Sequence, residues 1–600
     1  MTKSIKYSIA VVDWLVELGY THCFFVPGGN SMHLLDGART KMQCVPFVHE
    51  VSATIAAEYF NETTTGGRAW VLLTAGPGLT HSLSGIAGAF LEGRSLLILG
   101  GQVKTSDLAT NGLRQRGIQE INGVAIAAPI CKKAIRLERP ISEVDFKSVV
   151  NLQFGGKPGP VFIELCLDVQ GALIQFENLV GEGRSQESDV EIKFDALSAA
   201  KKLISRALEN SSRPVFLIGG GVARGASNLK DKLIEIGAPV MTTYNGADRI
   251  GREFDLYFGR PNTWGMRYSN ILLSQADLIV ALGTRLGLQQ TGFNWQNFAP
   301  SAKIIQVDID KLELTKGHPK IEAGFSVDAT DCLLGIEANY GNNRFDKWVR
   351  FCKEVKELLP LNEDVNSQHP GFWNPYHFFE RLSEISKSED VVIPCSSGGA
   401  FTAFFQAFEN KEGQTIVSNK SLASMGYGLA GAIGASIANP HKRVILIEGD
   451  GGFSQNLQEL ATVSVLKPNL KIFLFSNEGY ASIRMTQKNY FDGAYLGCDT
   501  KTGLGFPDWH TLSSAYGIGC SILSEDDFGS QRFTQSINSE VPHLFVVKLH
   551  PEQTFLPKIS SRISEHGGME SEPLWDISPK LHPDLNARVF LYSDQKVRKQ

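Results

Sequence analysis

The sequence of 600 residues lacks paired cysteines, an excess of charge of one sign and a long uninterrupted apolar block. Its nine cysteines are scattered singly, without a C-x-x-C pair or a zinc-ligand spacing, which favours reduced thiols and a cytoplasmic location. The 58 Lys and Arg nearly balance the 63 Asp and Glu, so neither a polyanion-binding face nor a basic anchor is expected. Nucleic acid and membranes are therefore not expected as partners.

Two uncharged stretches, 69–91 and 421–440, are long enough to be considered as membrane spans. The first is interrupted by Gly76-Pro77-Gly78, and the second consists mainly of Gly, Ala and Ser, whose small side chains contribute little transfer free energy. Both are predicted to be buried strand-turn-helix segments. The first twenty residues lack the apolar block of an export signal.

Short apolar runs alternate along the chain with amphipathic segments. One such segment, 5–18, has its apolar residues at helical spacing. The runs have lengths typical of strands buried on both faces: 70–74, 96–99, 161–165, 215–218, 278–282, 304–309, 444–448, 472–475 and 544–547. This alternation predicts an α/β fold of doubly wound parallel sheets.

Polar stretches at 177–191 and 361–373 lack apolar periodicity and are the predicted linkers. They divide the chain into three blocks of ordinary domain size and a tail. The predicted domains span residues 1–176, 192–345 and 365–550, followed by a C-terminal tail over 551–600.

Polar residues follow two of the predicted strands. Gly449-Asp450-Gly451-Gly452 comes after the run 444–447, and Ser476-Asn477-Glu478-Gly479 comes after 471–475. Since the carboxyl ends of parallel strands border one crevice, Asp450 and Asn477 can converge there. Carboxylate, amide and backbone oxygens are ligands that Mg²⁺ accepts while it also binds phosphate oxygens. The pattern predicts a metal-bridged diphosphate site, although Gly-Asp-Gly alone is common in turns.

This spacing resembles the metal-binding motif of thiamine diphosphate enzymes. His49-Glu50, the segment Thr74-Ala75-Gly76-Pro77-Gly78-Leu79-Thr80, Gln119-Glu120 and Met425-Gly426-Tyr427-Gly428 are similar to segments of acetohydroxyacid (acetolactate) synthases and related carboligases. The resemblance covers most of residues 1–550. It implies that the first predicted domain binds the aminopyrimidine ring, the third binds the diphosphate, and the second is the central domain.

The resemblance also implies roles for individual residues. Glu50 would share a proton with the aminopyrimidine ring, and Gln119 would lie near the bound intermediate. Asp450, Asn477 and the Gly479 carbonyl would bind Mg²⁺. The cofactor-binding residues would be Pro77, Gly398, Gly399, Met425, Gly451, Gly452 and Tyr480. Taken alone, Glu50 fits a helix-start carboxylate and Met425 fits a core side chain; His49 and His81 are interpreted as structural.

A nucleotide is the open question for the central block. Gly219-Gly220-Gly221 follows the apolar run 215–218, where a phosphate can bind at the turn. In acetohydroxyacid synthases the corresponding block binds FAD, and the resemblance places flavin contacts at Gly220, Gly221, Arg285 and Asp308. Lys157 and the pair Leu288-Gln289 depart from the family pattern, and Lys cannot reproduce the planar fork of Arg. The dinucleotide-like 426–431 segment follows no apolar strand, and close helix packing explains its small residues equally well, so a dinucleotide site there is the minority interpretation.

The expected reaction is decarboxylation of a 2-oxo acid, pyruvate in the first instance, and ligation of the two-carbon unit to a carbonyl acceptor. Ser482, Arg484 and Thr486 make the predicted acceptor pocket more polar than in the synthases, so a second pyruvate, a keto-sugar or an aldehyde all remain open. Arg484 fits a bidentate ligand for a substrate carboxylate or phosphate, although a solvated surface residue is the more ordinary interpretation. Simple decarboxylation and a non-catalytic binding protein are the alternatives. Because the resemblance implies active sites at subunit interfaces, a homodimer or homotetramer is expected.

Overall fold

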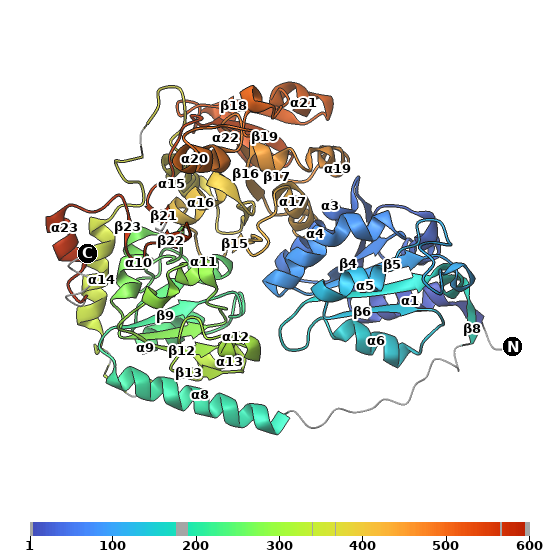
Figure 1. The fold of residues 1–600 in the computed structure, drawn as a ribbon, viewed down its shortest axis with the longest axis horizontal. Helices are drawn as coiled ribbons and strands as arrows, with labels where there is room; N and C mark the ends of the chain where they lie inside the picture. The colour runs from blue at the N-terminus through green and yellow to red at the C-terminus, as the bar shows by residue number, and fades with distance from the viewer. Residues whose placement is uncertain are drawn as a thin grey trace. The chain divides into compact units, whose positions relative to one another are not determined.

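The computed structural model describes residues 4–175, 190–338, 340–341, 343–366, 368–563 and 567–593. The chain forms two compact units (Figure 1). The first unit contains 1–185, 391–398 and 417–548, and the second contains 186–390, 399–416 and 549–600. Most of the predicted 177–191 linker, and the end of the first predicted domain at 176, lie outside the described residues.

The first unit begins with a sheet of parallel strands in the order β3-β2-β4-β5-β7-β6. The strands are β2 (Tyr20–Phe25), β3 (Gln43–Pro46), β4 (Arg68–Leu73), β5 (Leu96–Gln102), β6 (Lys133–Leu137) and β7 (Pro160–Cys166). The main helices are α1 (Tyr7–Glu17), α2 (Met32–Ala38), α3 (Glu50–Thr63), α4 (Pro77–Glu92) and α6 (Glu143–Asn151), with short α5 (Gly123–Ala127) and α7 (Leu167–Gly171). β1 (Ser4–Lys6) pairs antiparallel with β8 (Leu173–Gln175). Val71 and Trp70 pack into different apolar clusters, so β4 is buried on both faces.

The same unit contains a second parallel sheet in the order β14-β16-β17-β19-β18. Its strands are β14 (Val391–Ile393), β16 (Val444–Gly449), β17 (Leu470–Ser476), β18 (Gly519–Leu523) and β19 (His543–Lys548). Its helices are α17 (Tyr427–Ala438), α18 (Asp450–Phe453), α19 (Leu460–Leu466), α20 (Ala481–Tyr490), α21 (Trp509–Ala515) and α22 (Gln531–Asn538). The short turn from β16 to α18 places Asp450 at the carboxyl end of β16.

Helices α3 and α17 pack against each other through small residues. A side chain at Gly434 would place its Cβ 2.0 Å from the Ala56 carbonyl oxygen, and one at Gly431 would meet the Tyr59 ring. Glycine at these positions lets the two helix backbones approach closely. The Gly-rich segment 426–431 therefore supports helix packing, as the sequence indicates.

The second unit contains a parallel sheet in the order β10-β9-β11-β12-β13. The strands are β9 (Pro214–Ile218), β10 (Val240–Thr242), β11 (Leu278–Leu282), β12 (Lys303–Val307) and β13 (Ala323–Phe325), and β15 (Thr415–Ile416) also lies in this unit. The helices are α8 (Val190–Asn210), α9 (Leu229–Ile236), α10 (Arg267–Ser274), α11 (Leu288–Thr291), α12 (Lys311–Thr315), α13 (Ala329–Leu334), α14 (Asp346–Leu358), α15 (Pro375–Ile385) and α16 (Gly398–Ala407). The chain as a whole thus has the predicted fold class, with three helix-flanked parallel sheets.

The C-terminal tail packs on the second unit. It forms β20 (Lys558–Ile559), β21 (Ser561–Ile563), β22 (Met569–Ser571), β23 (Ile577–Ser578) and α23 (Pro583–Val589), and α23 lies beside α14 (Figure 1). Arg267 of α10 donates hydrogen bonds to the carbonyls of Ile577 and Pro579 at 3.0 and 2.9 Å, and Trp575 joins the apolar cluster under α14. The tail is therefore part of the core of this unit.

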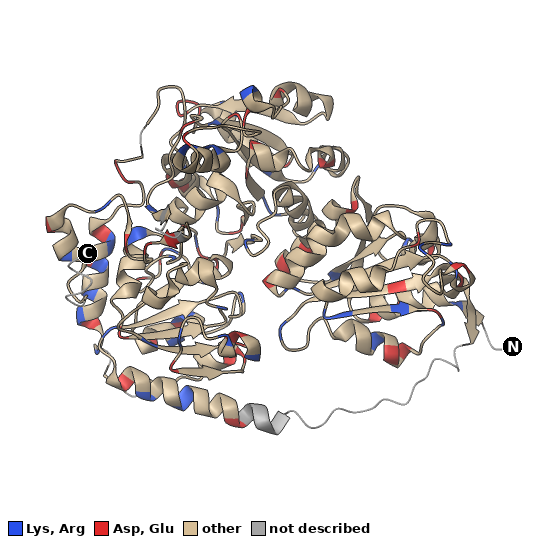
Figure 2. Cartoon of the chain, in the orientation of Figure 1, with Lys and Arg blue, Asp and Glu red and all other residues tan. Residues whose placement is uncertain are grey.

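Charged residues of both signs are interspersed along the described chain (Figure 2). Within the described ranges, none of the helices has the length and apolar character required to cross a membrane. The stretches 69–91 and 421–440 form β4 with α4, and α17 with the loop before it.

Candidate active site

Asp450 and Asn477 meet at the carboxyl ends of neighbouring strands β16 and β17. The backbone N–H of Asn477 donates to Asp450 Oδ2 at 3.0 Å, and the N–H of Gly451 donates to Oδ1 at 2.8 Å. Asp450 is the first residue of α18, so the amino end of that helix faces its carboxylate. Parallel pairing in register brings the two residues together although they are far apart in the sequence.

The polar atoms of this pair are buried and incompletely satisfied. Among the described residues, Asn477 Oδ1 has no hydrogen-bond partner. Burial raises the pKa of Asp450 to about 6, against the opposing effect of backbone N–H groups from Asn477, Gly451 and Gly479. A buried carboxylate beside an unpaired amide oxygen is the environment in which a cation would compensate both groups. The donor set therefore fits Mg²⁺.

Arg484 fixes the backbone of the loop that follows β17. Its guanidinium donates to the carbonyl of Asn477 at 2.7 Å and to that of Glu478 at 3.2 Å, and its side chain is buried. The sequence left two interpretations of Arg484, a ligand for a substrate carboxylate or phosphate and a solvated surface residue. The structure shows that this Arg holds the candidate metal loop instead. Thr486 donates to the Ser482 carbonyl within α20 at 3.0 Å.

Tyr480 lies across the glycines of α18. A Cβ on Gly451 would lie 2.2 Å from the Tyr480 ring, and one on Gly452 would lie 3.0 Å from Glu448 Oε1. Gly479, whose carbonyl accepts the N–H of Ala481 at 3.1 Å, completes the turn between β17 and Tyr480. Glycine at positions 451 and 452 thus leaves room for the Tyr480 ring and the Glu448 carboxylate, which a Cβ would meet.

Met425 precedes α17 and is 38% exposed. Its sulfur accepts a weak hydrogen bond from Gln455 Nε2 at 3.7 Å, and Gly426 beside it has φ of +82°. A large apolar side chain left this exposed is not a core residue, so the core interpretation of Met425 is wrong.

Pro77 begins α4, and Gln119 packs beside it. A Cβ on Gly76, whose φ is +66°, would lie 2.4 Å from the Gln119 carbonyl oxygen. Gln119 itself has φ of +63°, a conformation that costs free energy in non-glycine residues. The neighbouring Glu120 anchors this segment, because its carboxylate accepts the N–H groups of Ala109, Arg116 and Gly117. Burial would raise the pKa of Glu120, but these hydrogen bonds lower it.

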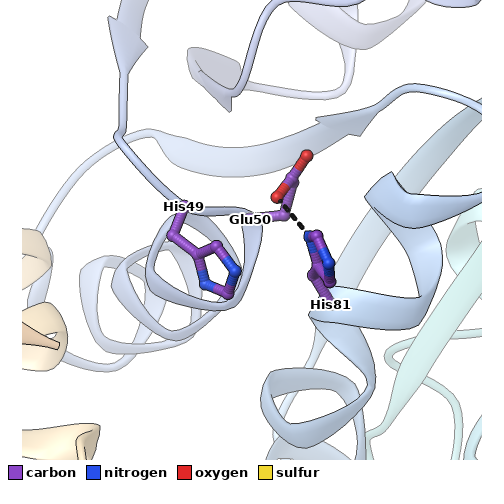
Figure 3. Close-up of side chains that lie close together, drawn as sticks. All are labelled: His49, Glu50 and His81. Carbon is purple, nitrogen blue, oxygen red and sulfur yellow. Dashed lines mark hydrogen bonds and ion pairs between the residues drawn. The ribbon is translucent and has the colours of Figure 1, made fainter. Parts of the chain in front are cut away.

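Glu50 is the first residue of α3 and contacts a histidine on α4 (Figure 3). His81 Nδ1 lies 3.0 Å from Glu50 Oε2, and the side chains are 46% and 10% exposed. The His49 ring stacks on the His81 ring, with centroids 4.7 Å apart. Sequence reasoning treated both histidines as structural and missed the His81 contact; the available signal was a His on the helix after the Gly-Pro-Gly turn.

The three side chains at this point have the donor types of a transition-metal site, with ligand atoms within 4.8 Å of one another. The imidazole planes, however, are only 28° apart and stacked. Because a ring nitrogen coordinates in the plane of its ring, stacked rings do not direct both nitrogens at one ion. The cluster therefore fits hydrogen bonding better than metal coordination.

Three family models match the chain. Residues 5–126 match the N-terminal binding domain of thiamine pyrophosphate enzymes, 202–355 match the central domain and 397–547 match the C-terminal binding domain. The chain belongs to the thiamine pyrophosphate enzyme family. The fold and the recognition of the family from the sequence are thereby confirmed, and the protein is an enzyme that uses thiamine diphosphate.

The chain is similar to acetolactate synthases over most of its length. It is 28% identical to a probable acetolactate synthase large subunit of Methanocaldococcus jannaschii, over 92% of this chain and 93% of the relative. It is 26% identical to the acetolactate synthase isozyme 2 large subunit of Escherichia coli, over 92% of this chain and 96% of the relative. It is 28% identical to the acetolactate synthase large subunit of Cyanidium caldarium, over 87% of this chain and 90% of the relative.

The remaining predicted cofactor-binding residues, Gly398 and Gly399, begin α16. Gly398 has φ of +78°, and a Cβ on Gly399 would lie 2.3 Å from the Phe555 ring. Phe555, which belongs to the tail, therefore requires glycine at position 399 whether or not a cofactor is bound.

The predicted flavin contacts lie at the carboxyl ends of the central strands. A Cβ on Gly221 would lie 2.7 Å from Gly283 Cα, and the Gly221 N–H donates to the Gly283 carbonyl at 2.9 Å. Asp308 Oδ1 accepts the N–H of Asp310 at 2.9 Å, and Arg285 contributes its carbonyl to Lys316. Close approach of two backbones thus accounts for Gly221 without a nucleotide, and FAD binding at Gly220, Gly221, Arg285 and Asp308 stays a prediction.

Proposed function

We propose that this enzyme decarboxylates a 2-oxo acid, pyruvate in the first instance, and transfers the two-carbon unit to a carbonyl acceptor in the manner of an acetolactate synthase. The observation that carries the proposal is the buried Asp450 carboxylate beside the unpaired Asn477 Oδ1, at strand ends that match the C-terminal binding domain of the family. Similarity to acetolactate synthases over more than nine-tenths of this chain supports the reaction class.

Mg²⁺ would be held by Asp450, Asn477 Oδ1 and the Gly479 carbonyl, and Gly451 and Gly452 would admit the diphosphate. When bound, thiamine diphosphate supplies a nucleophilic carbon and accepts the electrons released by decarboxylation. The chain's own contribution is proton control: Glu50, 10% exposed, holds or releases a proton at the aminopyrimidine ring. Met425 would contact the cofactor, and Pro77, Gln119, Gly398, Gly399 and Tyr480 would line the site.

The acceptor substrate is open to three chemistries: a second 2-oxo acid, a keto-sugar or an aldehyde. Arg484 donates to backbone carbonyls, so it supplies no carboxylate-binding fork to the acceptor. Ser482 and Thr486 are exposed along α20, which supports an acceptor region with hydroxyl groups.

The active enzyme is proposed to be a homodimer or homotetramer. Several large apolar side chains are exposed in the single chain, including Ile118 at 82%, Leu496 at 76% and Phe491 at 62%. Assembly into a homodimer or homotetramer would cover apolar surface of this kind. Light scattering on purified protein tests the assembly, and a monomer that turns over substrate contradicts it.

A cytoplasmic location is proposed because the nine cysteines are unpaired.

FAD binding by the central domain is a separate proposal. Flavin released by heat from the purified protein would be measured by its fluorescence. Full activity without flavin would exclude FAD as a required cofactor, and the proposed reaction would still stand.

The deciding experiment combines the protein with thiamine diphosphate, Mg²⁺ and labelled pyruvate, with and without candidate acceptors, followed by product identification. Acetolactate formed without an added acceptor supports the synthase reaction. Acetaldehyde alone would replace it by simple decarboxylation. Absence of any turnover, with the cofactor bound, would exclude pyruvate as the donor substrate.

Two variants connect the products to the site. Glu50→Gln is expected to preserve cofactor affinity and to reduce turnover by about 10² or more, since proton transfer is lost while packing is retained. Asp450→Ala is expected to abolish Mg²⁺-dependent binding of the cofactor in calorimetry. Unchanged turnover or unchanged binding, respectively, would reject the assigned role.

A further inference from the structure

The Glu50 carboxyl is nearly enclosed, yet its proposed role requires proton exchange. Among the described residues, His81 is the side chain that is hydrogen bonded to this carboxylate, with Nδ1 and Oε2 3.0 Å apart. The two differ strongly in exposure, 10% for Glu50 and 46% for His81. The half-exposed His81 side chain therefore lies directly beside the buried acid (Figure 3).

We infer that His81 relays protons between water and Glu50, an inference that rests on the proposed function of Glu50. A carboxylate only accepts, so Nδ1–H of His81 donates to ionised Glu50. A proton from hydronium in the solvent then binds Nε2 as the Nδ1 proton passes to Oε2, which leaves water, protonated Glu50 and neutral His81. The reverse sequence returns the proton to water. Imidazole can accept at one nitrogen while it releases at the other, so no net charge accumulates on His81.

The surrounding structure fixes the geometry that a relay needs. Ser82, next to His81 on α4, donates to the carbonyls of Gly78 at 2.8 Å and Glu50 at 3.4 Å, which ties the two helices at this level. The His49 ring covers one face of His81. The backbone N–H of His49 is itself held by Glu459 Oε1 at 3.0 Å. His49 therefore orients the His81 ring, and His81 is a positioning residue with a proton-transfer role.

The test uses His81→Ala, His81→Asn and an exposed control, His441→Ala. Asn can donate to Glu50 but cannot relay a proton. Both His81 variants are expected to lower kcat, and the exchange of the thiazolium carbon proton of the bound cofactor with deuterium, by about 10²-fold with cofactor affinity unchanged. Added imidazole is expected to restore His81→Ala by several-fold and to leave His81→Asn unchanged. Native kcat in His81→Asn, or no restoration of His81→Ala by imidazole, overturns the relay.

A second measurement needs no cofactor. Carbethoxylation at pH 8, followed residue by residue by mass spectrometry, is expected to modify His81 at a rate within about threefold of exposed His441, and more slowly in Glu50→Gln because the polarising carboxylate is lost. An unreactive His81 in the native protein overturns the relay. Turnover that survives Glu50→Gln rejects the role of Glu50 and the relay together, whereas native kcat in His81→Asn rejects the relay alone.

Discussion

Replacing Asn477 by Ala should have opposite effects on the protein with and without its cofactor. Asn477 Oδ1 is buried without a partner among the described residues, and such an acceptor costs about 1–3 kcal/mol while no cation is bound. Removing it should therefore stabilise the cofactor-free chain by about 1 kcal/mol, since lost packing contacts offset part of the gain. Losing one Mg²⁺ ligand should weaken cofactor binding at least about tenfold, which corresponds to about 1.4 kcal/mol.

Asn469 provides the matched control at the other end of strand β17. Its Oδ1 is also buried without a partner among the described residues, but it lies before Leu470, at the amino end of the strand. Asn469→Ala should raise stability and leave cofactor affinity unchanged. Urea unfolding of cofactor-free protein should show both midpoints raised by about 0.3–1 M, and calorimetry with Mg²⁺ and thiamine diphosphate should separate the two variants. If Asn477→Ala lowers the midpoint, or binds cofactor with native affinity, the assignment of Oδ1 to the metal is refuted.

Three further predictions concern the loop, the sheet and the helix contact. Arg484→Met and Arg484→Lys should each weaken Mg²⁺-dependent cofactor binding about tenfold by calorimetry, because neither reproduces the guanidinium fork; equal affinity would contradict this. Burial lowers the pKa of Lys471 to about 8, so the unfolded chain binds more protons than the folded chain between pH 8 and about 10.5. The free energy of unfolding should therefore rise with pH in this range. If its dependence on pH is just as steep in Lys471→Met, the prediction is refuted. Gly434→Ala places a methyl group against the Ala56 backbone and should lower the free energy of unfolding by about 1–3 kcal/mol in thermal unfolding. Gly66→Ala, at a position with free space around it, should leave the free energy of unfolding unchanged.

Much of the fold could be predicted because it depends on local pattern. The apolar run 161–165 lies within β7 (Pro160–Cys166), and the helical spacing over 5–18 corresponds to α1 (Tyr7–Glu17). Apolar length and periodicity determine whether a segment suits a buried strand or an amphipathic helix. The meeting of Asp450 with Asn477 could be predicted for a similar reason, since parallel strands place their carboxyl ends at one edge.

Tertiary structure decided what depends on packing between distant segments. Whether Arg484 faces substrate or backbone depends on the turn of the loop after β17, and its residue type suits either. Likewise, only the crossing of α3 and α4 brings His81 to Glu50, and only the packing of the tail places Phe555 on Gly399. The sequence by itself determined the elements, the family and the meeting of Asp450 with Asn477 at the strand ends, because these rest on local chemistry and regular geometry. The partners of Arg484, His81 and the tail required the folded chain, because side-chain contacts follow from long-range packing that no local pattern records.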